Sequence, residues 1–153
     1  MALGGDPEQI RALARRMRSE ASDVEVTASR VRRGDGVQWV GLAAERYRER
    51  LRDHAREIDE TRDALTGAAR KLDHLADTLE ERQRLIAAAM NAVEDTVSAA
   101  RHTVGRFAGA VWDTLTGAEK KAEEAARDLL DSVGDLPPPG HPDWLDLARR
   151  IGR

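Results

Sequence analysis

The sequence has no cysteine among its 153 residues, which excludes disulfide bonds, cysteine-ligated metal sites and a thiol nucleophile. Aromatic residues are also scarce, with three tryptophans, one tyrosine and one phenylalanine. Charged residues make up 35% of the chain. A chain with so few large side chains and so many charges is typical of long, thin helices rather than of a thick globular core. The composition therefore predicts an all-α protein.

Long hydrophobic runs are absent as well. No stretch approaches the ~18 apolar residues that a membrane span needs. The first residues, MALGGDPEQ, lack the basic start and apolar core of a secretory signal peptide, so export would need a route independent of such a peptide. The formal net charge of −3 gives no bias towards nucleic acid, and the basic run at 15–18 is interpreted as a solvated helix face.

Catalytic and metal-binding patterns are missing too. No second histidine lies within one helical turn of any of the four histidines, so zinc-ligand spacing is absent. Acidic pairs fall on helix faces interpreted as solvated, and no phosphate-binding loop is present. We therefore predict a protein that is not an enzyme and has no cofactor and no metal. The histidines are His54, His74, His102 and His141.

Residues 7–33 carry the signals of a first helix. Asp6 suits the N-cap, Pro7 the first helical position, and Gly34 a left-handed C-terminal end. Large apolar residues recur every seven positions with alanines between them, a narrow seam that favours a close antiparallel helix pair. The large residues are Ile10, Met17, Val24 and Val31, and the alanines are Ala14, Ala21 and Ala28.

A second helix is predicted over residues 42–100, after a turn at 34–41. Its only internal weak point is Gly67, since glycine costs ~1 kcal/mol relative to alanine in a helix. The main apolar row again repeats every seven residues, and a weaker row flanks it. The main row is Leu51, Ile58, Leu65, Leu72, Leu79, Ile86, Val93 and Ala100. The weaker row is Tyr47, His54, Thr61, Ala68, Leu75, Arg82, Ala89 and Thr96.

Together these helices predict a long, coiled-coil-like antiparallel hairpin over residues 1–100. If the chain reverses at residue 37 or 38, Ile10 lies beside Leu65 and the first helix ends near Gly67. The apolar row beyond Gly67 would then form an exposed patch that soluble monomers rarely tolerate. Either another chain or the C-terminal third of this chain must cover it.

The remaining third is predicted to be an amphipathic helical extension, 101–134, followed by a proline-rich linker and short helix, 135–153. A helix at 118–134 should use one apolar face, and Trp112 should join the core. The short helix places Trp144, Leu147 and Ile151 on one face. That face either docks on the chain's own bundle or binds a groove of another protein. The face at 118–134 comprises Ala122, Ala125, Leu129 and Val133.

The turn holds an isolated tryptophan among glycines, in the stretch GDGVQWVGLAAERY. Gly34 and Gly36 can adopt positive φ, and Gly41 can let the backbone pass closely before the second helix. Trp39 is expected to wedge between the two helix ends, where other side chains are small. A capped turn stapled by tryptophan explains these residues without any further function.

The triplet Trp39-Val40-Gly41, between two helices with a seven-residue period, resembles the Trp-Xaa-Gly (ESAT-like) family of type VII secretion substrates. The resemblance covers roughly residues 6–95, and Tyr47 fits its context. It implies a hairpin that pairs with itself or with a related hairpin into a four-helix bundle. It also implies export by a membrane ATPase, often together with a larger secreted effector. The region after about residue 100 resembles helical segments of longer actinobacterial effectors.

One feature of that family is absent. Its export signal is a tyrosine followed four residues later by an acid, whereas Tyr47 is followed by Leu51. Three hypotheses remain: a secreted type VII substrate or targeting module, a cytoplasmic coiled-coil scaffold or adaptor, and a membrane-surface protein with 96–117 on lipid. The expected partner interface is Tyr47, Leu51, Ile58, Leu65, Leu72, Leu75, Leu79 and Ile86.

Overall fold

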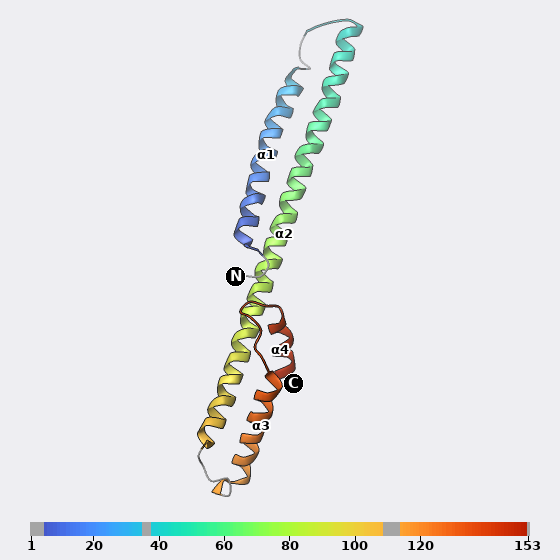
Figure 1. Ribbon diagram of the computed structural model, residues 1–153. Coiled ribbons are helices and arrows are strands. Elements are labelled where there is room, and N and C mark those ends of the chain that lie inside the picture. Colours follow the sequence, from blue (N-terminus) through green and yellow to red (C-terminus); the bar gives the residue numbers. More distant parts are fainter. Residues whose placement is uncertain (1–4, 35–37, 109–113, 153) are drawn as a thin grey trace. The chain divides into compact units, whose positions relative to one another are not determined.

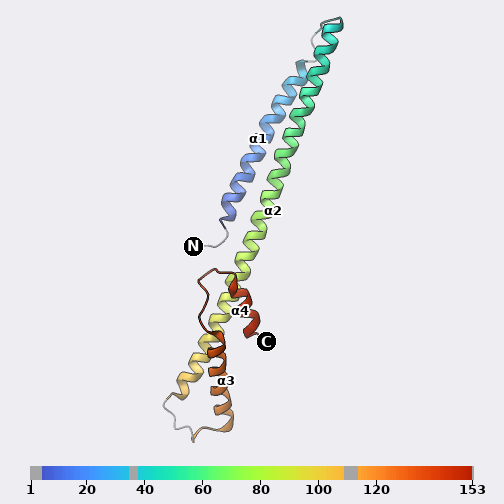
Figure 2. The same cartoon turned by 45° about the vertical axis from the view of Figure 1, so that its right-hand side comes forward.

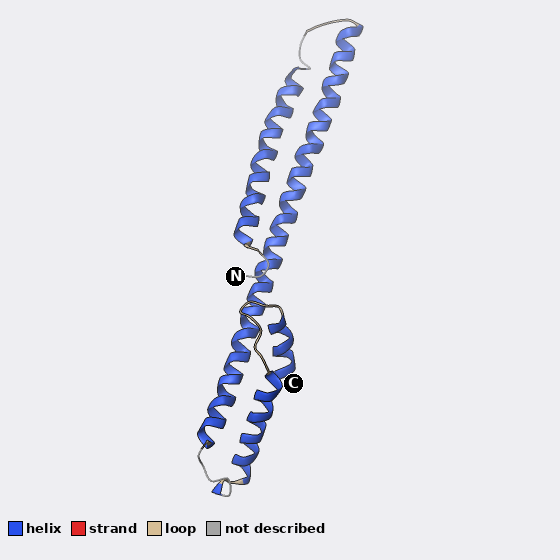
Figure 3. Cartoon of the chain, in the orientation of Figure 1, coloured by secondary structure: helices blue, strands red, loops and turns tan. Residues whose placement is uncertain are grey.

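A computed structural model describes residues 5–34, 38–108 and 114–152. Every regular element in this part of the chain is an α-helix, as the composition predicts (Figure 3). The chain divides into two compact units: Gly5–Leu79, called the hairpin unit, and the chain from Glu80 onward, called the C-terminal unit. The helices are α1 (Pro7–Arg33), α2 (Leu42–Phe107), α3 (Gly117–Val133) and α4 (Asp143–Ile151).

The ends of α1 and α2 follow from local backbone chemistry. Asp6 caps α1 as predicted, because its side chain accepts a hydrogen bond from the Glu8 amide at 2.9 Å. Gly34 ends α1 with a right-handed φ of −66°, so the predicted left-handed cap is wrong. The positive φ, 107°, belongs to Gly41, whose carbonyl accepts the first amide bonds of α2. A Cβ there would meet nothing within 4 Å, so Gly41 is needed for its φ and not for close approach.

In the hairpin unit, α1 runs antiparallel to the first part of α2 (Figures 1 and 2). Small alanine side chains are buried on both helices. The predicted alanine row of α1 is fully buried. The second buried row of α2 lies one position later than predicted, since His54 and Leu75 are exposed. Methyl side chains let two helix backbones approach closely, which bulkier residues prevent. The buried alanines of this unit are Ala14, Ala21 and Ala28 of α1 and Ala44, Ala55, Ala69 and Ala76 of α2.

Ion pairs between α1 and α2 fix the register of the hairpin. Arg11 Nη2 lies 2.9 Å from Asp77 Oδ1, so Ile10 lies near Leu79 and not beside Leu65 as predicted. The predicted tight reversal is wrong because α2 begins beyond the end of α1, with Gly34 close to Leu51. As a result α1 covers α2 as far as Leu79, two seven-residue repeats beyond the expectation. The other pairs are Arg18–Asp73, Arg32–Asp59 and Arg62–Glu25.

In the C-terminal unit, α3 and α4 lie against the second part of α2 (Figures 1 and 2). Of the two ways to cover the apolar row after residue 80, the chain uses its own C-terminal third. Trp144 and Leu147 of α4 dock on the chain itself, and Trp144 Nε1 donates to the Pro138 carbonyl at 2.9 Å. The buried cluster comprises Ile86, Val93, Val97, Val133, Trp144 and Leu147.

The buried face of α3 differs from the prediction. Glu123, Ala126 and Val133 are buried, whereas Ala122 and Ala125 are exposed. The apolar pattern gave the wrong face because alanine fits either a buried or an exposed face. Glu123 is buried, and its Oε1 lies 2.6 Å from Arg127 Nη2. A capping box that the sequence reading missed starts the helix: Thr116 and Glu119 exchange side-chain-to-backbone hydrogen bonds. The side-chain bond to Thr116 lowers the pKa of Glu119, so this contact weakens as pH falls through that pKa.

The helix α2 continues through Gly67 and ends at Phe107, seven residues beyond the predicted end at residue 100. Val97 and Ala100 are buried within the C-terminal unit, and Val104 is half-buried. The apolar face of 96–107 is therefore already covered by protein, which argues against the hypothesis that 96–117 lies on lipid. The predictions for Trp112 and Gly36 fall outside the described residues.

Gly67 offers a direct test of this continuous helix. Nothing lies within 4 Å of a Cβ placed there, so Gly67→Ala should raise the free energy of unfolding by roughly 0.5–1 kcal/mol. Gly41→Ala is the matched control, and because of the positive φ it should lower stability instead. Urea unfolding followed by circular dichroism measures both. A destabilising Gly67→Ala would show that the helix breaks at this position.

Candidate functional site

The hairpin unit has two chemically different sides. Four residues after each buried alanine of α1 come the ion-pairing residues Arg18, Glu25 and Arg32. Three residues after the same alanines come large aliphatic residues. A step of four turns a helix by about +40° and a step of three by about −60°, so the two sets lie on opposite sides of the alanine row. We call them the ion-pair side and the aliphatic side. The aliphatic residues of α1 are Met17, Val24 and Val31.

Arginines on the ion-pair side are held by carboxylates. The hydrogen bond to Asp59 raises the pKa of Arg32, and the bond to Glu25 raises the pKa of Arg62. The pairs Arg11–Asp77, Arg18–Asp73, Arg32–Asp59 and Arg62–Glu25 use groups that are at least partly exposed, so each contributes little to stability. Their effect is to select one register for the two helices and to keep this side polar.

On the aliphatic side, most of the predicted interface residues are half-buried. Two leucines lie one residue before a buried alanine and are more exposed. Leu75, before Ala76, is 53% exposed, and Leu13, before Ala14, is 44% exposed. Two residues of the predicted set lie elsewhere: Ile86 is buried in the C-terminal unit, and Tyr47 lies at the end of the hairpin beside Trp39. The half-buried members of the predicted set are Leu51, Ile58, Leu65, Leu72 and Leu79.

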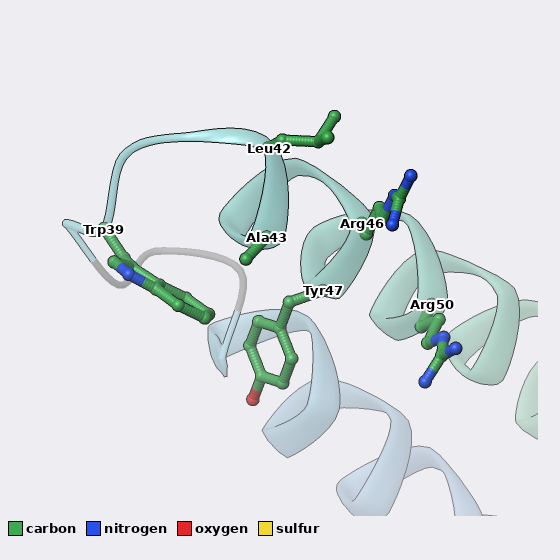
Figure 4. Close-up of a pocket in the computed structure, with 6 residues that line it drawn as sticks. All are labelled: Trp39, Leu42, Ala43, Arg46, Tyr47 and Arg50. Atoms are coloured by element: carbon green, nitrogen blue, oxygen red, sulfur yellow. The ribbon is translucent and has the colours of Figure 1, made fainter.

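Trp39 does not wedge between the helix ends. Its side chain is 48% exposed, and its ring meets the Tyr47 ring edge-on, with centroids 6.1 Å apart and planes at 61°. Tyr47 points from α2 towards the end of α1, whereas Leu42 points to the opposite side (Figure 4). Arg48 donates to the Trp39 carbonyl at 2.6 Å and so ties the connection to α2. We call residues 38–50 the Trp39 end.

A groove runs along the Trp39 end. Apolar and aromatic side chains form most of its lining, with two guanidinium groups beside them (Figure 4). Such a surface binds apolar groups and anions by contact and charge. A groove of this composition is suited to the recognition of another molecule. The lining residues are Trp39, Leu42, Ala43, Arg46, Tyr47 and Arg50.

The sequence reading missed the arginines of this end, although the signal is present. Residues 30–56 hold eight arginines and four acidic residues, a net charge of +4 in a chain whose total is −3. In RYRERLR, at 46–52, arginine alternates with other residues. This spacing looks like an ordinary amphipathic helix and not like a basic cluster. Counting charge by segment would have found it.

Among the described residues, no group of three or more histidine, aspartate or glutamate side chains could hold a metal ion. None of the described helices combines the length and apolar character that crossing a bilayer requires.

Because Trp39 is half-exposed, Trp39→Ala should lower the stability of the monomeric chain by only about 1 kcal/mol, the value of one aromatic pair with partial burial. Tyr47→Ala should cost a similar amount, and the double variant less than the sum, since the two rings share one contact. Thermal unfolding measures all three. If Trp39→Ala lowered the free energy of unfolding by more than about 3 kcal/mol, Trp39 would have to be buried between the helix ends, as the sequence suggested.

Comparison with known proteins agrees with a targeting role. Residues 2–146 match the family described as "Putative T7SS secretion signal domain", where T7SS is the type VII secretion system. No curated protein and no solved structure gives a significant match. The family match spans nearly the whole chain of 153 residues. The chain therefore belongs to this family of type VII secretion signal domains, which are targeting modules rather than catalytic domains.

Proposed function

We propose that this chain is a non-enzymatic type VII secretion substrate, or the targeting module of one, and that it acts by pairing its hairpin with a second helical hairpin. The family supports the secretion role. The Trp39-Val40-Gly41 triplet between α1 and α2 supports the closer relation to Trp-Xaa-Gly proteins. The partner is a second copy or a related hairpin, with a larger effector and the secretion ATPase as further partners.

The proposed pairing is supported by the difference between the aliphatic side and the ion-pair side of the hairpin. Two helices that meet through alanine cannot bury the large aliphatic residues beside the alanine row, and these remain half-buried. Leu13 and Leu75 lie at the level of the Arg11–Asp77 pair and are the most exposed of them. A second hairpin laid on this side would bury the row and complete a four-helix bundle. The ion-pair side offers no such gain.

Leu75→Asp tests this interface. If hairpins pair through the aliphatic side, a charge at Leu75 must be buried without a partner, and the dimer should weaken at least tenfold. Light scattering over a range of concentrations gives the mass. Because Leu75 is exposed within the single chain, the helicity and melting of the monomer should change little.

Val26→Asp is the matched control, since Val26 is similarly exposed but lies on the outer side of α1, two residues from Ala28. Its mass should equal that of the wild type. Equal weakening by both variants, or a wild-type chain that remains monomeric alone and with every co-expressed hairpin, would contradict pairing through the aliphatic side.

The cytoplasmic scaffold or adaptor stays as a second candidate because of one observation. Tyr47 lies at the Trp39 end and is followed four residues later by Leu51. The tyrosine-based export signal of the Trp-Xaa-Gly family is therefore not formed there. In our proposal a partner chain supplies that signal. Export of this chain should therefore require both the secretion ATPase and the partner, whereas a scaffold would stay inside the cell.

A further inference from the structure

We infer that the Trp39 end of the hairpin unit docks on the surface of an anionic membrane. The inference goes beyond pairing, because it concerns the end of the hairpin and not its aliphatic side. It starts from an unusual concentration of exposed apolar side chains. Val40 is 91% exposed and Leu42 64%, and Trp39 and Tyr47 are each nearly half-exposed. All four lie within nine consecutive residues.

The register of the hairpin leaves much of this end uncovered by α1, although Ala44 is buried. Gly34, just after α1, lies beside Leu51, so the first nine residues of α2 extend about 13 Å beyond α1. Leu42, Arg46 and Arg50 follow one another at steps of four and share one face of that extension. Tryptophan and tyrosine are the side chains enriched where a bilayer meets water, because each has an apolar ring and a polar group.

Charge selects an anionic surface. Residues 38–50 hold three arginines and two glutamates, a net charge of +1, and the wider segment 30–56 carries +4 while the rest of the chain carries −7. Arg46 and Arg50 line the groove beside the exposed apolar residues. Arginine side chains near an anionic leaflet are attracted to lipid headgroups, and this attraction is screened by salt. The residues of the hairpin unit outside 30–56 carry −4, so their repulsion would orient this unit with the Trp39 end towards the lipid.

The placement of the apolar groups favours a lipid surface over an acidic peptide held in the groove. Val40 is the most exposed of the large hydrophobic residues and does not line the groove. A peptide lying in the groove would leave Val40 in water. Shallow insertion of the whole end would instead cover Val40 and Leu42 together, with the two groove arginines at headgroup depth.

Vesicle flotation with the full chain tests the inference. We expect the chain to float with vesicles of phosphatidylglycerol and phosphatidylcholine, at least tenfold more than with phosphatidylcholine alone, and to be released by 0.5 M salt. Val40→Asp should reduce flotation at least fivefold, and Val26→Asp should not. Arg46→Glu with Arg50→Glu should abolish it, whereas Arg15→Glu with Arg16→Glu, the same charge change at exposed positions of α1, should leave most of it.

Three results would overturn the inference. One is no flotation with the anionic vesicles. Another is equal loss for the two arginine pairs, which would reduce the binding to general electrostatics. The third is an unchanged vesicle interaction in Val40→Asp together with lost binding to an acidic partner protein, which would make this end a protein-docking site. Circular dichroism of each variant excludes misfolding, and the mass measurements of Leu75→Asp report on pairing independently.

Discussion

Trp144→Ala should destabilise the C-terminal unit by roughly 3–5 kcal/mol, the usual cost of removing a buried aromatic side chain. Trp144 is 2% exposed and belongs to the cluster that joins α4 to Val93 and Val133. Its indole N–H donates to the Pro138 carbonyl, so the variant also leaves that carbonyl without this donor. The N-cap residue of the short helix α4, Pro142, makes no side-chain cap bond, and a helix of nine residues depends on this packing.

Hydrogen exchange locates the effect as well as its size. Amides of α3 and α4 should lose protection in Trp144→Ala, while amides of α1 keep theirs, because they belong to the other unit. Leu85→Ala is the control for side-chain loss on the same stretch of α2, since Leu85 is half-exposed. A change below about 1 kcal/mol, with α4 exchange unaltered, would show that α4 does not dock on its own chain.

Ala69→Leu should destabilise the hairpin unit by roughly 1–3 kcal/mol, because the added carbons have no room between the two helices. Ala69 is fully buried, and the ion pairs place it at the level of the equally small Ala21. Leucine and alanine have similar helix propensities, so the loss would reflect packing. The alanine rows allow the close approach that the larger side chain would prevent.

Ala64→Leu is the control, since Ala64 is exposed on the same helix and should tolerate leucine with little change. Denaturant unfolding gives the free energies, and a drop in the unfolding midpoint confined to Ala69→Leu is the expected pattern. If Ala69→Leu stabilised the chain, the helices would have to lie further apart than the buried alanines require.

Local signals predicted the helices well. Asp6 and Pro7 marked the start of α1, and Gly41 marked the start of α2, because capping chemistry acts within a few residues. The failures are tertiary. Register depended on ion pairs between residues 55 or 66 positions apart, such as Arg18–Asp73 and Arg11–Asp77, and periodicity alone does not encode that choice.

The candidate site was predicted in part for the same reason. The triplet Trp39-Val40-Gly41 drew attention to the end of the hairpin where the groove lies, but a buried wedge was inferred from size alone. Trp39 is half-exposed because α2 extends past the end of α1, so the ends of the two helices do not lie side by side around the ring. Likewise, alanine fits a core or a surface equally well, so the buried faces of α2 and α3 could not be chosen from apolarity.

Export in the native host is the decisive test of the proposed secretion role. The chain would be followed in culture supernatant and cell lysate, with and without the type VII secretion ATPase, beside a cytoplasmic protein as the lysis control. A type VII substrate should accumulate in the supernatant only when the ATPase is intact. Retention inside the cell in both strains would contradict that role, and the hairpin would then be an intracellular scaffold.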